Sequence, residues 1–367
     1  MPRSSMPPPA SAGPAMGATV SVRAIEDLAA ALPHLLGFPP VESLVVVAIE
    51  GPRGELTFTL RLDLPEPDEI GEVVEICAAR MQAAAADAVL AFVVTEAADV
   101  APGQLPGVEL VEALQRSVVM PLRDAFLLRG GRIWSYLCPD PACCPPDGRP
   151  YDAGSPVATT LAAAGVVAGR PMFRDRDEIV RSAQAVDGAE AEAMRAAVER
   201  VRGTEAVPDL VGLRERYAAA LPGLLARCAE RGPDVAPDEA ALLGCAWHQI
   251  DLRDEVLIAV AQGSAGADPL VRAVARLIPA PYDAPAAAML GWVAYAEGSG
   301  VLAAAALERA LRTDPGYSLA VLLDDALYRQ VPPSALRSVW ASFAEDDRRR
   351  HPRRAGPPRR RRPARGG

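Results

Sequence analysis

Hydrophobic residues change their spacing several times in the first part of the chain, and each change predicts a different element. Apolar positions recur at helical spacing over 24–36, with Gly37 as a helix stop. The run LVVVAI over 44–49 has no polar position, which is typical of a strand buried on both faces. After the turn GPRG, residues 55–64 alternate strictly, which predicts the second strand of a hairpin. Its outward-facing residues are expected to be Thr57, Thr59, Arg61 and Asp63.

The same changes of spacing continue to about residue 137. They predict a helix over 68–86, a buried strand over 88–96 and a helix over 108–122. Gly130-Gly131 then joins two short strands, because paired glycines favour a two-residue hairpin turn. The order α-β-β-α-β-α-β-β indicates an α/β domain with a mixed sheet and flanking helices.

From about residue 157 the pattern is almost entirely helical. We expect helices over 161–167, 189–202 and 210–231, the last interrupted at Pro222. Longer helical patterns fill 240–261 and 286–327.

One C-terminal segment fits the tetratricopeptide pattern. Leu290-Gly291 occupies the Leu-Gly position of that repeat, and Gly298 marks the turn between two helices. The small-large-small positions of the second helix are Ala303, Leu307 and Ala310, so Leu307 is expected to fill the gap between the helices. Asp314-Pro315 is interpreted as the start of the next helix, with Asp314 as N-cap.

A weaker copy of the repeat begins at Leu243-Gly244. The alternative interpretation is a generic helical hairpin with no peptide groove, since arrays of this kind usually need three or more units.

These patterns divide the chain into five parts. A disordered tail (1–18) precedes the α/β domain (19–156), and a helical connecting region (157–232) leads to the helical-hairpin domain (233–343). The chain ends in a disordered arginine-rich tail (344–367).

Composition excludes several chemistries. All 38 basic residues are arginine, so a Walker-type phosphate loop and a Schiff-base lysine are both excluded. With only three histidines, a multi-histidine metal centre is disfavoured.

Charge and hydropathy indicate where the protein acts. Residues 348–367 hold ten arginines and no acid, while the rest of the chain has 28 arginines against 47 acids. The tail is therefore expected to attract nucleic acid or an acidic partner weakly, and the body to repel nucleic acid. No segment has the length of a membrane span or the pattern of a signal peptide, so we expect a cytoplasmic protein without membrane contact.

The most unusual stretch is CPDPACCPPDGRPY over 138–151. It contains Cys138, Cys143 and Cys144 with no second cysteine cluster and no C-x-x-C motif. We interpret these cysteines as packing a turn that continues a buried face with Trp134 and Tyr136, and we predict no cofactor. Zinc, with Asp140 or Asp147 as fourth ligand, and a reactive thiol are the alternatives.

Other polar clusters have simpler interpretations. His248 and Asp251 stand three residues apart and form a candidate acid-base pair, although Asp251 as a helix cap is favoured. Asp324-Asp325 is interpreted as a solvated helix face, because consecutive helical residues do not converge. The charged run 174–178 is interpreted as ion pairs at a helix start.

Three segments together resemble a known family. They are LPHLLGFPPVESLVVVAIEG (32–51), CCPPDGRP (143–150) and ALERALRTDPGYSLAVLLDDAL (306–327). Over about residues 20 to 340 the chain is similar to domain-of-unknown-function family 4192, a group of uncharacterised actinobacterial proteins. The resemblance implies the same two-part architecture and no activity, cofactor or catalytic residue. Similar proteins carry a Gly-Asp turn where this chain has Ile250-Asp251.

No catalytic motif assembles from these observations. We therefore expect a non-catalytic interaction or scaffold protein whose helical domain contacts a protein partner. The alternative is an enzyme or small-ligand domain with a site near residues 138–151, called here the Cys-Pro turn. A further alternative is nucleic-acid association through the tail.

Overall fold

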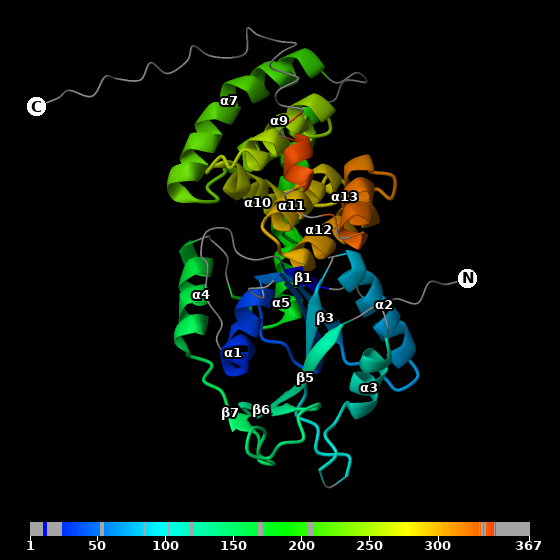
Figure 1. The fold of residues 1–367 in the computed structure, drawn as a ribbon. Helices are drawn as coiled ribbons and strands as arrows, with labels where there is room; N and C mark the ends of the chain where they lie inside the picture. Colours follow the sequence, from blue (N-terminus) through cyan, green and yellow to red (C-terminus); the bar gives the residue numbers. More distant parts are fainter. Residues whose placement is uncertain are drawn as a thin grey trace, which may run out of the picture.

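A mixed sheet flanked by helices forms one part of the molecule, and a largely helical region forms the other (Figure 1). The computed structural model describes residues 10–12, 24–51, 55–83, 86–101, 103–117, 121–167, 172–203, 209–329, 331, 333, 335–340 and 342. This arrangement confirms the fold class predicted from the sequence.

The strands form a single sheet in the order β1-β3-β2-β4-β5-β6-β7. All neighbouring pairs are antiparallel except β4 and β5, which are parallel. The hairpin turn between β5 and β6 uses Gly130 (φ 54°) and Gly131 (φ 72°), as predicted, because both positions need a left-handed backbone. The strands are β1 (Ala10–Ala12), β2 (Ser43–Glu50), β3 (Glu55–Asp63), β4 (Ala88–Val94), β5 (Leu122–Arg129), β6 (Arg132–Ser135) and β7 (Arg149–Pro150).

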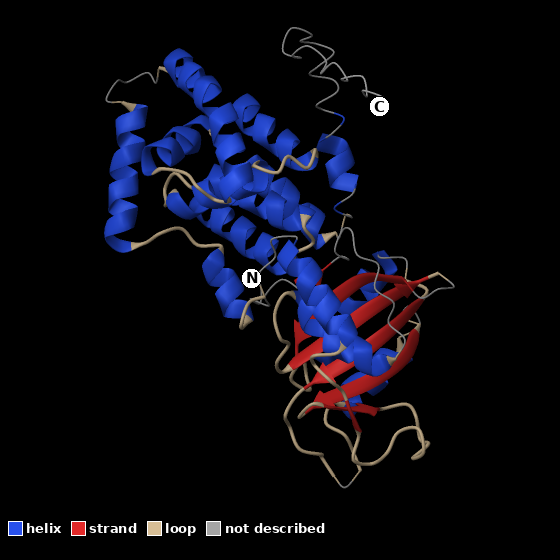
Figure 2. Ribbon diagram, turned by 90° about the vertical axis from the view of Figure 1, so that its left-hand side faces the viewer, coloured by secondary structure: helices blue, strands red, loops and turns tan. Residues whose placement is uncertain are grey.

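Helices cover both faces of the sheet (Figures 1 and 2). α2 (Ile70–Ala83) and α3 (Val108–Arg116) pack on the face that carries Leu44 and Val46. α1 (Ile25–Leu36) packs on the opposite face, against Val45 and Val47. β2 is therefore buried on both faces, which explains its uninterrupted apolar sequence.

Helices make up the chain after β7. They are α4 (Pro156–Val167), α5 (Arg176–Ser182), α6 (Gly188–Arg202), α7 (Leu210–Arg231), α8 (Pro237–Ala246), α9 (Ile250–Ala261), α10 (Ala267–Leu277), α11 (Ala284–Ala296), α12 (Gly300–Thr313) and α13 (Ser318–Tyr328). The first of them, α4, packs beside α1 of the α/β part (Figure 1). α11 is buried along its whole length and packs most extensively against α12.

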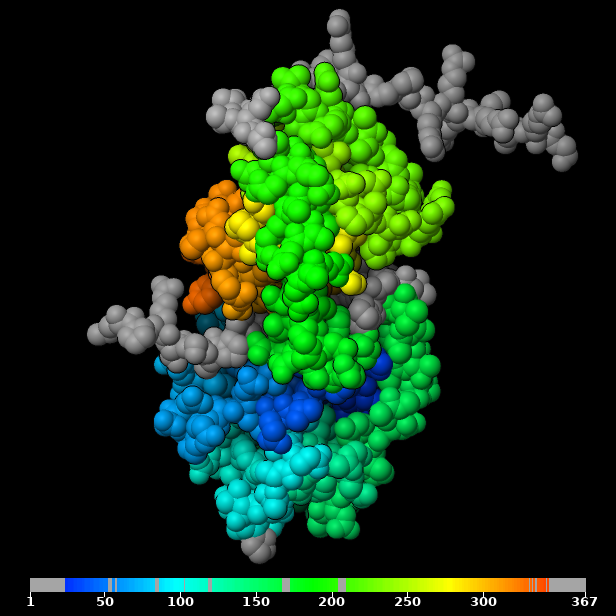
Figure 3. Space-filling model, turned by 180° about the vertical axis from the view of Figure 1, so that it is seen from behind, coloured from blue at the N-terminus to red at the C-terminus, as the bar shows by residue number. Residues whose placement is uncertain are grey.

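The two parts share a continuous hydrophobic core. α5 packs against α12, and Ile179 of α5 belongs to the same apolar cluster as the α1 face of the sheet and the buried helices. Seen from behind, the green surface of this part of the chain continues from the blue α/β part up to the yellow and orange helices (Figure 3). Of the predicted N-terminal tail, the structure describes Ala10–Ala12, which pair with β3 as β1.

Several local predictions were wrong. The helix predicted over 108–122 ends at Arg116, and Leu122 begins β5, because Pro121 disfavours helix before it. α7 continues through Pro222 without a break, since Tyr217, Leu221 and Leu224 are buried along one side and offset the lost hydrogen bond.

Two further corrections concern polar residues. Thr59 and Arg61 are buried instead of solvated, and the Arg61 guanidinium is held by Ser43 Oγ, which accepts from Nε at 2.8 Å, and by the Val41 carbonyl, which accepts from Nη2 at 3.2 Å. Asp314 ends α12 instead of starting the next helix: its Oδ1 accepts the Gly316 N–H at 3.0 Å, and α13 starts at Ser318.

Candidate functional site

The three cysteines of the Cys-Pro turn converge. The sulfur atoms of Cys138, Cys143 and Cys144 all lie within 4.8 Å of one another, and all three are free thiols. Cys143 is exposed and the other two are half-buried, so solvent reaches the cluster. Neither Asp140 nor Asp147, the fourth ligands considered from the sequence, belongs to this group.

The turn that holds the sulfurs is fixed by its own backbone. The Asp140 carbonyl oxygen accepts the N–H groups of Cys143 at 3.1 Å and Cys144 at 2.7 Å. The Asp140 carboxylate Oδ1 accepts the Ala142 N–H at 2.9 Å. Cys138 is held separately, because its N–H donates to Ser135 Oγ at 3.0 Å. Asp140 therefore fixes the turn that places the sulfurs of Cys143 and Cys144 beside that of Cys138.

β6 anchors the rest of the turn. The Trp134 indole N–H donates to the Pro146 carbonyl at 2.9 Å, and the Arg132 guanidinium donates to the carbonyls of Asp147 at 2.6 Å and Gly148 at 2.9 Å. The guanidinium of Arg129 stacks over the Trp134 ring at 4.9 Å. Trp134 and Tyr136 pack against the same hydrophobic cluster, as their predicted shared face requires, and the Tyr136 hydroxyl donates to the Pro106 carbonyl near α3.

The three thiols do not have equivalent acidities. Hydrogen bonds from the Asp140 backbone and from Cys144 lower the pKa of Cys138. Burial, followed by the hydrogen bonds to Cys138 and Cys143, raises the pKa of Cys144 to about 12. The cluster therefore favours its first negative charge on Cys138, with the Cys144 thiol protonated and donating a hydrogen bond to it.

The predicted acid-base pair is divided between two environments. The cap role predicted for Asp251 is wrong, because Gln249 is the N-cap of α9 and Asp251 is its second residue. Asp251 binds Arg214, whose Nη2 donates to its Oδ1 at 3.0 Å, and this pair lowers the pKa of Asp251. His248 instead lines a cavity in the helical region. Desolvation lowers the pKa of His248, so the imidazole is neutral at pH 7.

That cavity has a volume of about 700 Å³ and lies among α6, α7 and α8. Its apolar wall consists of Val198, Val201, Leu210 and Leu213. Its polar lining consists of Arg202, Asp209, Arg216, Cys245, His248, Gln249 and Tyr282. The volume lies in the range of small-molecule sites.

Positive charge dominates the polar lining. The Arg202 guanidinium lies over the Tyr282 ring at 5.3 Å, and Arg216 makes long contacts with the backbone carbonyls of Gly212 and Val201, at 3.4 and 3.5 Å. Within the described part of the chain, neither arginine forms an ion pair with a carboxylate. The Asp209 carboxylate caps α7, where its Oδ1 accepts the Gly212 N–H at 2.8 Å.

A smaller hollow of about 330 Å³ lies where β4 ends and α3 begins. Glu42 lines it and has a positive φ of 42°, a backbone strain unusual outside glycine. Its carboxylate accepts the Thr95 hydroxyl at 2.7 Å and the Glu96 N–H at 3.2 Å, so both oxygens are engaged. These bonds join the start of β2 to the end of β4.

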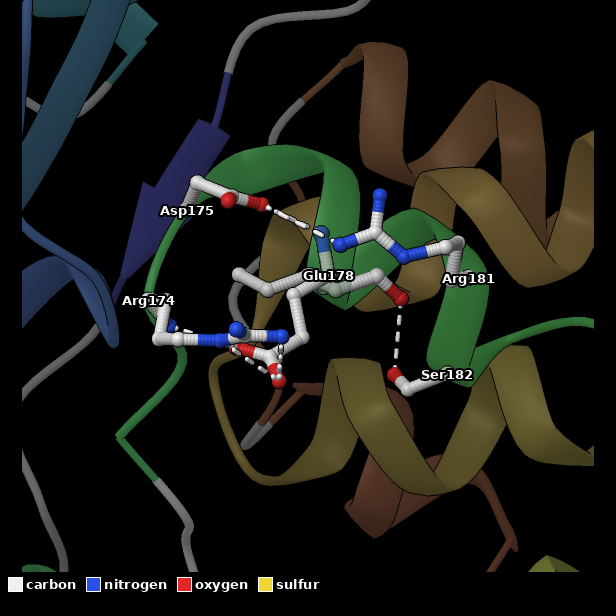
Figure 4. Close-up of polar contacts among 6 residues, drawn as sticks. Arg174, Asp175, Glu178, Arg181 and Ser182 are labelled. Carbon is white, nitrogen blue, oxygen red and sulfur yellow. Dashed lines mark hydrogen bonds and ion pairs between the residues drawn. The ribbon is translucent and has the colours of Figure 1, made fainter.

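The charged run before α5 forms a helix start, as predicted (Figure 4). The Asp175 Oδ1 accepts the Glu178 N–H at 2.6 Å, and the Glu178 carboxylate accepts the Arg174 N–H at 2.6 Å. Asp325 pairs with Arg329 at 2.8 Å, separately from its neighbour Asp324. The charged run 174–178 and Asp325 therefore both have structural partners. The arginine-rich tail (344–367) lies outside the described residues.

Sequence reasoning missed the cavity arginines for an identifiable reason. Arg202, Arg216 and Tyr282 come from separate parts of the chain, and no spacing rule connects them. The one local signal was the three-residue spacing of Cys245 and His248, which places both side chains on the cavity side at the C-terminal end of α8. Only the packing of α6 and α7 on α8 brings the arginines to that side.

Comparison with known proteins gives a family and no activity. No curated protein and no solved structure matches the chain. Within the described residues, the helices fall short of the length and apolar character that a membrane crossing requires. A family model, described as a domain of unknown function (DUF4192), matches residues 26–334. The chain belongs to this family.

Proposed function

We propose that the protein is a non-catalytic binding protein that takes up a small anionic molecule in the cavity among α6, α7 and α8. The observation that carries this proposal is the pair Arg202 and Arg216, which line a cavity of about 700 Å³ without a carboxylate partner among the described residues. An anionic group bound there would gain charge-assisted hydrogen bonds that the free protein lacks.

The lining also indicates the rest of the ligand. Val198, Val201, Leu210 and Leu213 supply an apolar wall, so the preferred ligand has a carboxylate, sulfonate or phosphate attached to an apolar body. Gln249 and His248 offer hydrogen bonds that orient its polar end.

Binding without chemistry is favoured by the state of the nucleophile in the lining. Burial raises the pKa of the Cys245 thiol to about 11, and its sulfur is directed at the Val198 carbonyl oxygen, 3.7 Å away. A protonated thiol is a poor nucleophile. Asp251 pairs with Arg214 and not with His248, so among the described residues no carboxylate orients His248 as a general base.

The test uses 8-anilinonaphthalene-1-sulfonate, an anionic probe with an apolar body, and the full-length chain. Arg202→Gln/Arg216→Gln is compared with Arg200→Gln/Arg214→Gln, which removes the same charge from the same two helices outside the cavity lining. Losing charge-assisted hydrogen bonds is expected to weaken probe binding by about 10- to 100-fold in the first variant only. Equal probe affinity in the two variants contradicts the proposal.

A pH series provides a second measurement on the same site. Because the folded-state pKa of His248 lies below 6.5, its ring gains a proton only as the pH falls below that value. The probe keeps its negative charge, so its affinity should rise over that interval, and His248→Asn should remove the rise. The wider role predicted from the repeat-like spacing, contact with a protein partner, stays a prediction.

A further inference from the structure

We infer that Cys138, Cys143 and Cys144 form a zinc site in which three thiolates bind one Zn²⁺ and a water molecule occupies the fourth position. This site is separate from the proposed anion cavity, because it lies on the turn after β6 and shares no residue with it.

The spacing of the sulfur atoms fits a single ion. With Zn–S bonds of about 2.3 Å, tetrahedral geometry places neighbouring sulfurs about 3.8 Å apart. The three sulfurs already lie within 4.8 Å of one another, so small side-chain rotations bring them to that separation. Thiolates are soft ligands, and three of them favour zinc over calcium or magnesium.

The backbone holds this arrangement before any ion arrives. Asp140 fixes the N–H groups of Cys143 and Cys144, while Ser135 fixes that of Cys138. Ser135 is itself oriented, because its hydroxyl donates to Asp124 Oδ1 at 3.0 Å. A turn formed only for packing has no need to aim three thiols at one point, two of them half-buried and one exposed.

The fourth position is open among the described residues. The group that converges contains only the three cysteines, and Asp140 uses its Oδ1 on the Ala142 N–H. Closed structural zinc sites use four protein ligands, whereas sites with three protein ligands keep a position for water or an exchangeable ligand. When the ion binds, three S–Zn bonds form and the thiol protons pass to the buffer, which leaves a centre of net charge −1.

The experiment titrates the reduced, metal-free full-length chain with Zn²⁺ against a chromophoric chelator. Wild type is expected to bind one zinc per chain with release of up to three protons, measured in a weakly buffered indicator solution. Cys143→Ser should bind at least about 10-fold more weakly, since even loss of an outer-sphere partner costs 10- to 100-fold. Cys245→Ser is the matched control, because its thiol lies on α8 away from the cluster, and it should bind as wild type does.

Co²⁺ gives a second measurement that does not depend on any variant folding correctly. Wild type loaded with Co²⁺ should show the intense visible bands of a tetrahedral ion and a sulfur-to-cobalt charge-transfer band. The inference is overturned by unchanged zinc affinity in Cys138→Ser/Cys143→Ser/Cys144→Ser, or by Co²⁺ bound to wild type without the charge-transfer band. Reduced wild type that binds no zinc overturns it as well.

Discussion

At the scale of single residues, one glycine determines how closely the Cys-Pro turn approaches the sheet. Gly148 has φ +68°, and a Cβ built on it would lie 2.4 Å from Cε2 of Trp134. The indole cannot move aside freely, because its N–H is bonded to the Pro146 carbonyl. Glycine is therefore required here both by the backbone conformation and by the close contact.

Gly148→Ala is expected to lower the free energy of unfolding by about 1–3 kcal/mol, because the added methyl group clashes with the ring and the left-handed backbone is strained. Urea unfolding followed by circular dichroism measures this change. Gly263→Ala is the control: it has a similar φ of +71° and no neighbour within 4 Å, so it carries only the backbone strain. Equal losses in the two variants would show that the contact with Trp134 has no energetic weight.

The sequence predicted the turn around 138–151 but not the convergence of its sulfurs. The prolines predict a turn and the alternation of β6 predicts a strand, and both signals are local in the sequence. Cys138 meets Cys143 and Cys144 because the Asp140 carbonyl accepts two N–H groups. Many turn sequences could form this pair of hydrogen bonds, and the sequence does not show which of them do. Local propensity predicts that the chain bends, while the atomic geometry of the bend decides its chemistry.

At the scale of elements, the spacing around α11 and α12 was informative. A Cβ on Gly291 would lie 2.7 Å from Cδ2 of Leu307, so the helices approach where the Leu-Gly position predicted a close contact. Gly298, with φ 82°, forms the turn between them. Gly244 of α8 is also closely packed, at 2.8 Å, but against Ile278 at the end of α10 and not against the next helix, so it does not repeat the arrangement of α11 and α12. Pattern reasoning succeeds here because small residues at a helix interface leave a sequence signature.

Gly291→Ala should therefore destabilise the protein by about 1–3 kcal/mol through overpacking against Leu307. Gly223→Ala, inside α7 with no neighbour within 4 Å, should instead stabilise it by about 0.5–1 kcal/mol, because alanine loses less backbone entropy in a helix. Thermal unfolding of both variants gives the sign of each effect. Combining Gly291→Ala with Leu307→Val should recover part of the loss, and the absence of any recovery would contradict direct contact as the cause.

At the scale of the whole molecule, the connections that matter join distant parts of the chain. The anion cavity uses residues from Val198 to Tyr282, and the continuous core links the sheet face of α1 to α11. Sequence patterns predicted most of the helices and strands but not these contacts, because periodicity reports which side of an element is apolar and not which element covers it. The bounds 157–232 and 233–343 were drawn from such patterns alone.

Arg309 illustrates a connection with no local signal. It is 3% exposed, its Nε donates to Asp283 Oδ2 at 2.8 Å, and its remaining nitrogens donate to three backbone carbonyls at 2.7–2.9 Å. These carbonyls belong to Ala183 after α5 and to Ala275 and Ile278 at the end of α10. One guanidinium thus holds α12 to segments up to 126 residues away in the sequence.

Arg309→Met is expected to cost about 3–5 kcal/mol, since it leaves the Asp283 carboxylate buried without its partner and removes donors from three carbonyls. Adding Asp283→Asn to that variant should recover part of the loss, because the uncompensated charge is then gone, although Thr313 still donates to the side chain. Arg312→Met on the same helix is the matched control: its pair with Glu308 is exposed and should change stability by less than about 1 kcal/mol. Chemical unfolding of the three variants measures the free energy of unfolding that each one loses. A loss in Arg309→Met no larger than that in Arg312→Met would mean that α12 is held by apolar packing alone, and that the buried arginine is dispensable to the contacts of α12 with the ends of α5 and α10.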